Sequence, residues 1–163
     1  MIAALLSLLL AARIAALEPS AADPLAHARA ATASARPGIQ APLLLAIAYH
    51  ESRFVPHAVS RVELGVRTGG AWPSRAPAGV GPWYCGPMQT AAGWDWALCL
   101  SLRDLRASYD DGAIVLGRWL HAARGDLRRA LDGYACGWAG LRRGCRGYGA
   151  AVLRTARRIG GGA

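Results

Sequence analysis

Apolar residues recur at helical spacing along most of the chain, and this pattern predicts a helical domain. Runs rich in Val, Ile, Thr and aromatic residues, which favour strands, are almost absent. We therefore expect an all-α or mainly α single domain. Helices are predicted over residues 25–35, 41–54, 91–98, 104–109, 111–124, 126–134 and 150–159.

Capping residues, prolines and glycines mark the predicted helix boundaries. Asp23-Pro24 is a cap followed by a first-turn proline, and Arg36-Pro37-Gly38 ends the helix that follows. Pro56 and Gly125 stop two later helices. The helix over 111–124 is expected to turn an apolar face inward, made of Ile114, Val115, Trp119 and Leu120.

Residues 60–82 differ from the rest of the chain because glycine and proline are dense in them. This composition predicts a long loop, with room for a short β-hairpin. Long loops in compact domains are often functional, and a tolerated surface insertion is the alternative.

The N-terminus predicts an export segment. The apolar run 2–12 is long enough for the core of a signal peptide and short for a membrane span. No positive charge precedes it, and Arg13 interrupts the expected cleavage region. We predict a signal peptide or hydrophobic export segment over residues 1–22 and a domain over 23–160. A hydrophobic first helix of the mature fold is the alternative.

Length and charge narrow the class of protein. The 163 residues suit one compact domain. The formal net charge is +9 and all 19 basic residues are Arg. This excess of positive charge favours anionic partners, namely nucleic acid, a membrane surface or an anionic polymer. The alternative is a solvated basic surface without a partner. Because the chain carries no nucleic-acid motif, we expect no nucleic-acid partner.

Four cysteines predict two disulfides in an exported domain of this size. Of the three possible pairings we favour the sequence-local one, Cys85–Cys99 with Cys136–Cys145, because each loop is short. No CxxC or His-x-x-x-His spacing supports the alternative of a zinc site. We expect no metal and no other cofactor.

The predicted helix over 41–54 holds the candidate catalytic carboxyl. Leu44, Ile47 and Ala48 share one face at helical spacing, and Glu51 is the next member of that series. Because burial disfavours the charged form of a carboxyl, such a group can stay protonated and act as a general acid. A buried Glu paired with an Arg is the alternative, for which Arg53 is poorly placed.

Several motifs in this region and beyond occur in an order that resembles the soluble lytic transglycosylase (SLT) family. Ala46–Phe54 resembles the family's Glu-Ser motif, Gly86–Thr90 its Gly-Leu-Met-Gln segment, and Leu105–Leu120 the helix that follows. Ala130–Gly137 resembles the family's Ala-Tyr-Asn-Ala-Gly motif, and Tyr148 falls where the family has a later Tyr. The resemblance covers about residues 22–158. It implies a lysozyme-like domain that cleaves peptidoglycan glycan strands.

The family resemblance also implies a mechanism in which Glu51 acts twice. It would protonate the oxygen between MurNAc and GlcNAc and then accept the proton of the MurNAc C6 hydroxyl, leaving a 1,6-anhydro sugar. The resemblance assigns Met88 and Gln89 to the groove lining and Tyr134, beside Glu51, to hydrogen bonding near the reacting sugar. Ser52 would position the substrate or a neighbouring carbonyl, with a local backbone hydrogen bond as the alternative. Tyr148 completes the substrate-binding set, and a packed core aromatic is the alternative for Tyr134.

Tryptophans are further candidates for sugar stacking. Trp83 and Trp138 flank motifs and are predicted to form groove walls, while Trp119 is expected in the core. The other three are Trp72, Trp94 and Trp96.

The chain also departs from the family pattern. Ala135 stands where the family has an Asn that helps shape the groove, so weaker activity or altered specificity is expected. His57 and Ala113 occupy two other positions where the family often has Asn, and Pro87 replaces a Leu.

Two alternatives keep the substrate and change the function. A hydrolytic muramidase would need a second carboxylate, for which Asp132 and Asp95 are candidates. A catalytically impaired peptidoglycan-binding module is the other alternative, favoured by Ala135. We expect an exported monomer in the periplasm or cell envelope, with peptidoglycan glycan strands as its partner, and the N-terminus is a candidate for membrane association.

Overall fold

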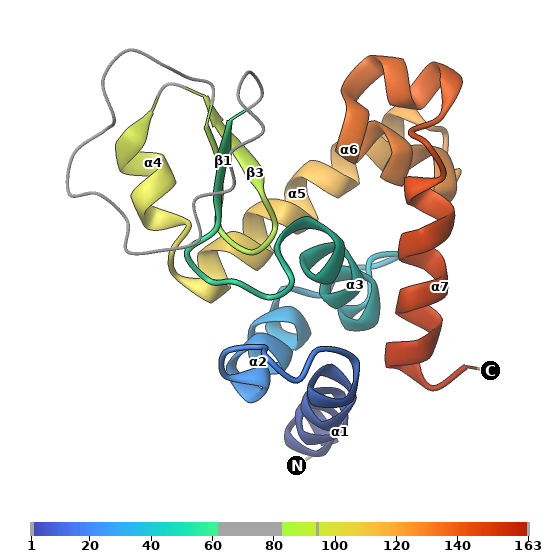
Figure 1. Cartoon of the computed structure of the whole chain (residues 1–163). Helices are drawn as coiled ribbons and strands as arrows, with labels where there is room; N and C mark the ends of the chain where they lie inside the picture. The colour runs from blue at the N-terminus through green and yellow to red at the C-terminus, as the bar shows by residue number, and fades with distance from the viewer. Residues whose placement is uncertain (1, 62–82, 94, 163) are drawn as a thin grey trace.

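The computed structural model describes residues 2–61, 83–93 and 95–162. It shows a mainly helical domain, as predicted, and a small antiparallel sheet (Figure 1). The elements are α1 (Ile2–Leu17), α2 (Pro24–Ser34), α3 (Ala41–Ser52), β1 (Val59–Arg61), β2 (Trp83–Cys85), β3 (Thr90–Gly93), α4 (Trp96–Ser101), α5 (Leu105–Ala122), α6 (Leu127–Arg143) and α7 (Tyr148–Gly160). The greater part of the predicted long loop, with Trp72, lies outside the described residues, as does Trp94.

Helix α3 forms the centre of the domain. Leu44, Leu45 and Ile47 are fully buried, and the helix packs against α2, α5 and α7. A helix that is apolar all round is stable only when neighbours cover every side. The unbroken apolar run 43–48 therefore agrees with the central position of α3 (Figure 1).

Helix α3 ends at Ser52, two residues earlier than predicted. Arg53 and Phe54 both adopt left-handed backbone conformations, with φ of 57° and 61°. This reversal carries the Phe54 ring back into the core, where it is fully buried against His27. The gain from burying this ring offsets the strain of two non-glycine residues at positive φ.

A three-stranded antiparallel sheet in the order β1-β2-β3 packs beside α4. The predicted helix over 91–98 is wrong, because 90–93 pair with β2 and the helix begins only at Trp96. Asp95 caps that helix by accepting a hydrogen bond from Leu98 N at 3.0 Å. Strand pairing satisfies the backbone of 90–93 and overrides the helical preference of its alanines.

Helix α5 joins two helices that were predicted separately, and Asp104 caps it. Its buried face contains Tyr109, Gly112, Ala113 and Leu116. The predicted inner face is wrong at Ile114, which is exposed, and the other three predicted residues are half-buried. Small residues lie inward because a Cβ on Gly112 would lie 2.5 Å from Met88 Cε.

Helix α6 continues to Arg143, nine residues beyond its predicted end, although Gly137 interrupts it with φ 61° and ψ −150°. The disulfide Cys136–Cys145 spans this interruption, and Cys85–Cys99 joins β2 to α4. Both are the predicted pairs. Helix α7 then begins at Tyr148, where Asp132 accepts a hydrogen bond from Gly149 N at 2.9 Å.

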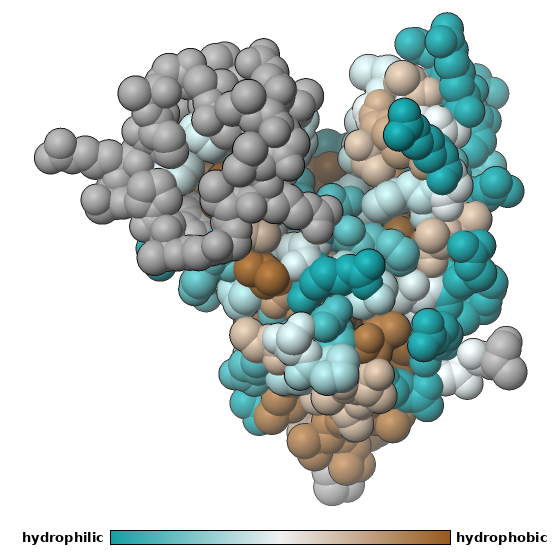
Figure 2. Space-filling view, in the orientation of Figure 1, coloured by the Kyte–Doolittle hydropathy of each residue, from teal (hydrophilic) through white to brown (hydrophobic). Residues whose placement is uncertain are grey.

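Helix α1 packs on α2 and α7 through a narrow stripe that includes Leu10 and Ile14. Several of its other apolar side chains are exposed, among them Ile2, Leu5, Leu8 and Leu9. The lower end of the molecule, where α1 lies in Figure 1, is brown in Figure 2. Among the described residues, no helix combines the length and apolar character needed to cross a membrane. The export segment over 1–22 stays a prediction.

Candidate active site

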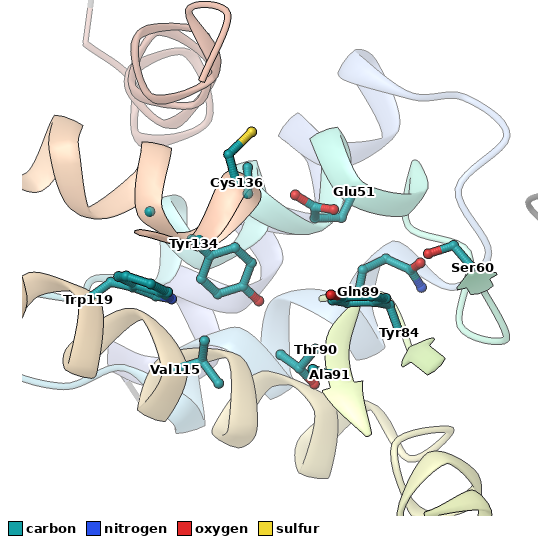
Figure 3. A pocket seen from close by; sticks show the side chains of 13 residues that line it. Glu51, Ser60, Tyr84, Gln89, Thr90, Ala91, Val115, Trp119, Tyr134 and Cys136 are labelled. Carbon is teal, nitrogen blue, oxygen red and sulfur yellow. The ribbon is translucent and has the colours of Figure 1, made fainter. Parts of the chain in front are cut away.

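A cleft of about 540 Å³ lies between the end of α3, the sheet, and helices α5 and α6 (Figure 3). Glu51 comes from α3, Tyr84 and Thr90 from the sheet, and Tyr134 from α6. The other described lining residues are Ser60, Gln89, Ala91, Val115, Trp119, Gly133, Ala135, Cys136 and Gly137. Segments far apart in the sequence thus meet around one carboxyl group.

Glu51 is half-buried in the last turn of α3, with its carboxyl group in the cleft. The hydroxyl of Tyr148, at the first turn of α7, donates a short hydrogen bond to Glu51 Oε1. The packing of α7 against α3 brings these two residues together across the core. A donor on one carboxyl oxygen restricts the orientation of the group.

Tyr134 lies on the opposite side of the cleft floor, and its hydroxyl donates to Met88 O at 2.8 Å. Burial raises the pKa of Tyr134 and of Tyr148 well above the usual range, and the negative charge of Glu51 raises both further. The hydrogen bond to Glu51 adds to the effect at Tyr148. Both hydroxyls therefore stay protonated at neutral pH and act as donors beside Glu51.

Ser52 is 4% exposed and lies behind the cleft wall. Its hydroxyl lies 3.1 Å from Ala48 O and 3.0 Å from Pro87 O, so it can donate to either carbonyl. The local backbone bond and the bond to a neighbouring carbonyl are both present. Ser52 thus connects α3 to the turn that carries Gln89.

Gln89 and Met88 have different positions, although both were expected to line the groove. The Gln89 side chain lines the cleft and donates from Nε2 to Ala58 O at 3.0 Å and Gly86 O at 2.8 Å. The Met88 side chain is fully buried against Gly112 and is not among the described lining residues. Met88 instead contributes its carbonyl, which holds the Tyr134 hydroxyl.

The tryptophans occupy positions that differ from the prediction. Trp83 is 4% exposed and packs against Trp96 in the core beneath the sheet, so it does not form a groove wall. Trp119 packs against the core, as expected, and it also lines the cleft. Trp138 is 61% exposed next to it, with ring centroids 5.3 Å apart. Trp119 lies four residues after Val115, which also lines the cleft. This helical spacing could have placed Trp119 on the cleft face of α5.

The candidate second carboxylates lie elsewhere. Asp132 is buried and accepts the Gly149 amide, and Asp95 caps α4. Among the described lining residues, Glu51 is the only one with a carboxyl group. Within residues 2–61, 83–93 and 95–162, no cluster of His, Cys, Asp and Glu side chains could hold a metal ion.

Sequence reasoning missed the contribution of the sheet to the cleft. Ser60, Tyr84 and Thr90 face Glu51 from strands whose pairing joins distant segments, and no local pattern marked them. Ala135, where the resemblance led us to expect the family Asn, lines the cleft. A methyl group there replaces a side chain that can both donate and accept hydrogen bonds.

Comparison with known families agrees with this arrangement. Residues 29–93 match the family model described as Transglycosylase SLT domain, which confirms the predicted resemblance. This segment runs from α2 to β3 and includes Glu51, Ser52 and Gln89. Neither curated proteins nor solved structures give a significant match.

The match supports a peptidoglycan-related activity of the transglycosylase or lysozyme type, in a mainly α, lysozyme-like domain. It covers less than half of the chain and ends before α6 and α7. The placement of Tyr134 and Tyr148 beside Glu51 therefore rests on the geometry of the cleft.

Proposed function

We propose that this protein is an exported peptidoglycan lytic transglycosylase that cleaves the MurNAc–GlcNAc β-1,4 bond, with Glu51 as the acid and base. The observation that carries the proposal is the Glu51 carboxyl, which lies in the cleft and belongs to the segment that matches the SLT domain. Tyr148, from outside that segment, donates a hydrogen bond to it. Among the described lining residues there is no second carboxylate of the kind that most hydrolytic glycosidases use.

In the first step, protonated Glu51 gives its proton to the glycosidic oxygen as the bond from this oxygen to MurNAc C1 breaks. The GlcNAc side leaves with a new hydroxyl group, and positive charge develops at C1. The Glu51 carboxylate formed in this step keeps the donated hydrogen bond from Tyr148. A hydroxyl donor stabilises the charged form of the carboxyl.

In the second step, the Glu51 carboxylate accepts the proton of the MurNAc C6 hydroxyl, and O6 forms a bond to C1. The product is a 1,6-anhydro sugar, Glu51 is protonated again, and no water is consumed. One carboxyl group serves both steps because the proton that it loses in the first is regained in the second. The protonated Tyr134 hydroxyl lies near Glu51 and donates to Met88 O, which helps to hold the turn at Met88.

A second candidate is a peptidoglycan-binding module with impaired catalysis, and Ala135 favours it. Its methyl group lines the cleft where the family pattern has an amide. The cleft would then still hold glycan without orienting it for reaction.

Product analysis tests these functions. The purified chain and its Glu51→Gln variant are incubated with peptidoglycan, and the soluble fragments are weighed by mass spectrometry. The proposal requires anhydro-muropeptides from the parent chain and none from the variant. Fragments with reducing ends would replace it with a muramidase, and binding without release would replace it with the binding module.

A further inference from the structure

Trp138 is a large aromatic residue on the surface at one end of the cleft. It is 61% exposed on α6, and its ring meets the Trp119 ring edge to face at 5.3 Å. Trp119 itself lines the cleft that contains Glu51. The two rings form an aromatic surface that continues from inside the cleft to the outside. Exposed aromatic surface of this kind is typical of binding sites.

The backbone holds Trp138 in this position by two devices. Gly137 adopts φ 61° and ψ −150°, a conformation that is essentially restricted to glycine, and the direction of α6 changes there. On the other side of Gly137, the Cys136–Cys145 disulfide fastens the helix to the segment before α7. An uninterrupted helix would direct residue 138 elsewhere. The position of the exposed ring therefore depends on a glycine in the backbone and on a cross-link.

Arg142 lies four residues after Trp138 in the helical part of α6 beyond Gly137. Residues at this spacing are neighbours on one helix face. Arg142 is exposed, and no ion pair with it occurs among the described residues. A planar aromatic ring beside a guanidinium group can bind a sugar that carries a carboxylate: the ring packs on the sugar's C–H face, and the guanidinium pairs with the acid.

We propose that Trp138 and Arg142 form an accessory subsite for a carboxylate-bearing sugar of the glycan strand, outside the cleft that holds Glu51. The inference rests on the proposed substrate, because MurNAc in strands without stem peptides carries a free lactyl carboxylate and GlcNAc carries none. The subsite extends the bound strand beyond the reacting bond. It favours glycan with MurNAc over glycan built from GlcNAc alone.

Binding measurements on the full chain test the subsite. All variants carry Glu51→Gln so that the ligand stays intact. The two ligands are a peptide-free GlcNAc–MurNAc tetrasaccharide with free lactyl carboxylates and neutral chitotetraose. The test variants are Trp138→Ala, Trp138→Phe and Arg142→Gln. Ile114→Ala and Arg118→Gln are matched controls, because these two exposed residues have the same four-residue spacing on α5 and are not among the described cleft residues.

We expect Trp138→Ala to weaken the binding of both ligands about tenfold and Trp138→Phe to weaken it less. Arg142→Gln should weaken the binding of the MurNAc ligand alone by about threefold, and high salt should remove this difference. The control variants should bind as the parent does. Circular dichroism checks that each variant is folded, which is expected because Trp138 and Arg142 are exposed.

Equal dissociation constants for Trp138→Ala and Ile114→Ala would overturn the subsite. An equal effect of Arg142→Gln on both ligands would overturn the role assigned to the carboxylate. Product analysis of the chain with Glu51 intact separates this inference from the proposed reaction. Anhydro products with binding that is independent of Trp138 would refute the subsite alone, whereas Trp138-dependent binding without products would refute the reaction alone.

Discussion

The two sides of the cleft are stabilised in different ways. The helical core, made of α1, α2, α3, α5, α6 and α7, buries an extensive apolar cluster centred on α3. The sheet lobe, made of β1, β2, β3 and α4, has a small cluster of its own and the Cys85–Cys99 disulfide. Because small cores supply little stabilisation, a cross-link matters far more to the lobe than to the core.

Under the proposed mechanism, the reacting group and the residues that would contact the substrate lie in different regions. Glu51 and Tyr148 belong to the helical core, whereas Tyr84 and Thr90 belong to the sheet lobe. The Met88 side chain, packed against Gly112 of α5, joins the two regions, together with polar contacts such as Ser52 with Pro87 O and Tyr134 with Met88 O. The Glu51 carboxyl is thus held by the densely packed core, and we expect that the lobe opposite it can be perturbed separately.

The largest expected effect is on catalysis alone. Glu51→Gln should lower the rate of anhydro-product formation at least about a thousandfold, because the amide can neither give nor accept the proton. The free energy of unfolding should change little, since the side chain is half-buried and the size is kept. Product mass spectrometry and urea unfolding measure the two quantities, with Asp110→Asn as the control. Retained activity would place the chemistry on another group.

A second change is directed at the sheet lobe. Replacing Cys85 and Cys99 together by Ser removes a cross-link with a sequence separation of 14 residues and should destabilise the lobe by about 3 kcal/mol. Hydrogen exchange should accelerate in β2 and β3 while α3 stays protected. The control is the double replacement of Cys136 and Cys145. If α3 lost protection equally, the two regions would be one cooperative unit.

Acid should act on the helical core instead. Burial lowers the pKa of His27 to about 4. Below the unfolded value of 6.5 the unfolded chain binds a proton that the folded chain does not, so stability falls with pH until about pH 4. By pH 4.5 the loss from this group should be about 2 to 3 kcal/mol.

His27→Gln removes this titration and should flatten the difference in unfolding free energy between pH 7.5 and 4.5. Urea unfolding at both pH values measures it, with His121→Gln on the surface of α5 as the control. The Gln variant also changes the hydrogen bond between His27 Nδ1 and the Tyr109 hydroxyl, at 2.9 Å, so only the pH dependence is diagnostic. An unchanged slope would show that other groups cause the acid sensitivity.

The smallest expected effect concerns the hydrogen bond from the Tyr148 hydroxyl to Glu51. Tyr148→Phe removes the hydroxyl that donates to Glu51, and we expect the rate to fall about tenfold to a hundredfold. The reason is that the carboxylate formed in the first step loses a donor. Steady-state rates on peptidoglycan measure the loss, and Tyr49→Phe on α3 is the control. A normal rate would mean that packing alone orients Glu51.

Local patterns in the sequence were sufficient for the helices with strong boundary signals. Asp23-Pro24 starts α2, and the spacing of Leu44, Ile47 and Ala48 placed Glu51 on a face directed toward the interior. The disulfide pairing also followed from short separations along the chain. These features depend on neighbours within a few residues, which is the range over which helical periodicity and caps act.

Features that depend on partners distant in the sequence were decided by the tertiary structure. Residues 90–93 are a strand because β2 pairs with them, and Met88 is buried because Gly112 allows α5 to approach. Trp83 lies under the sheet and Trp119 in the cleft for the same reason. The composition and helical spacing of the chain determined a mainly helical domain and placed the Glu51 carboxyl on an inward face of α3. Long-range packing determined which side chains surround it, because the free energy of burial depends on contacts that no local pattern specifies.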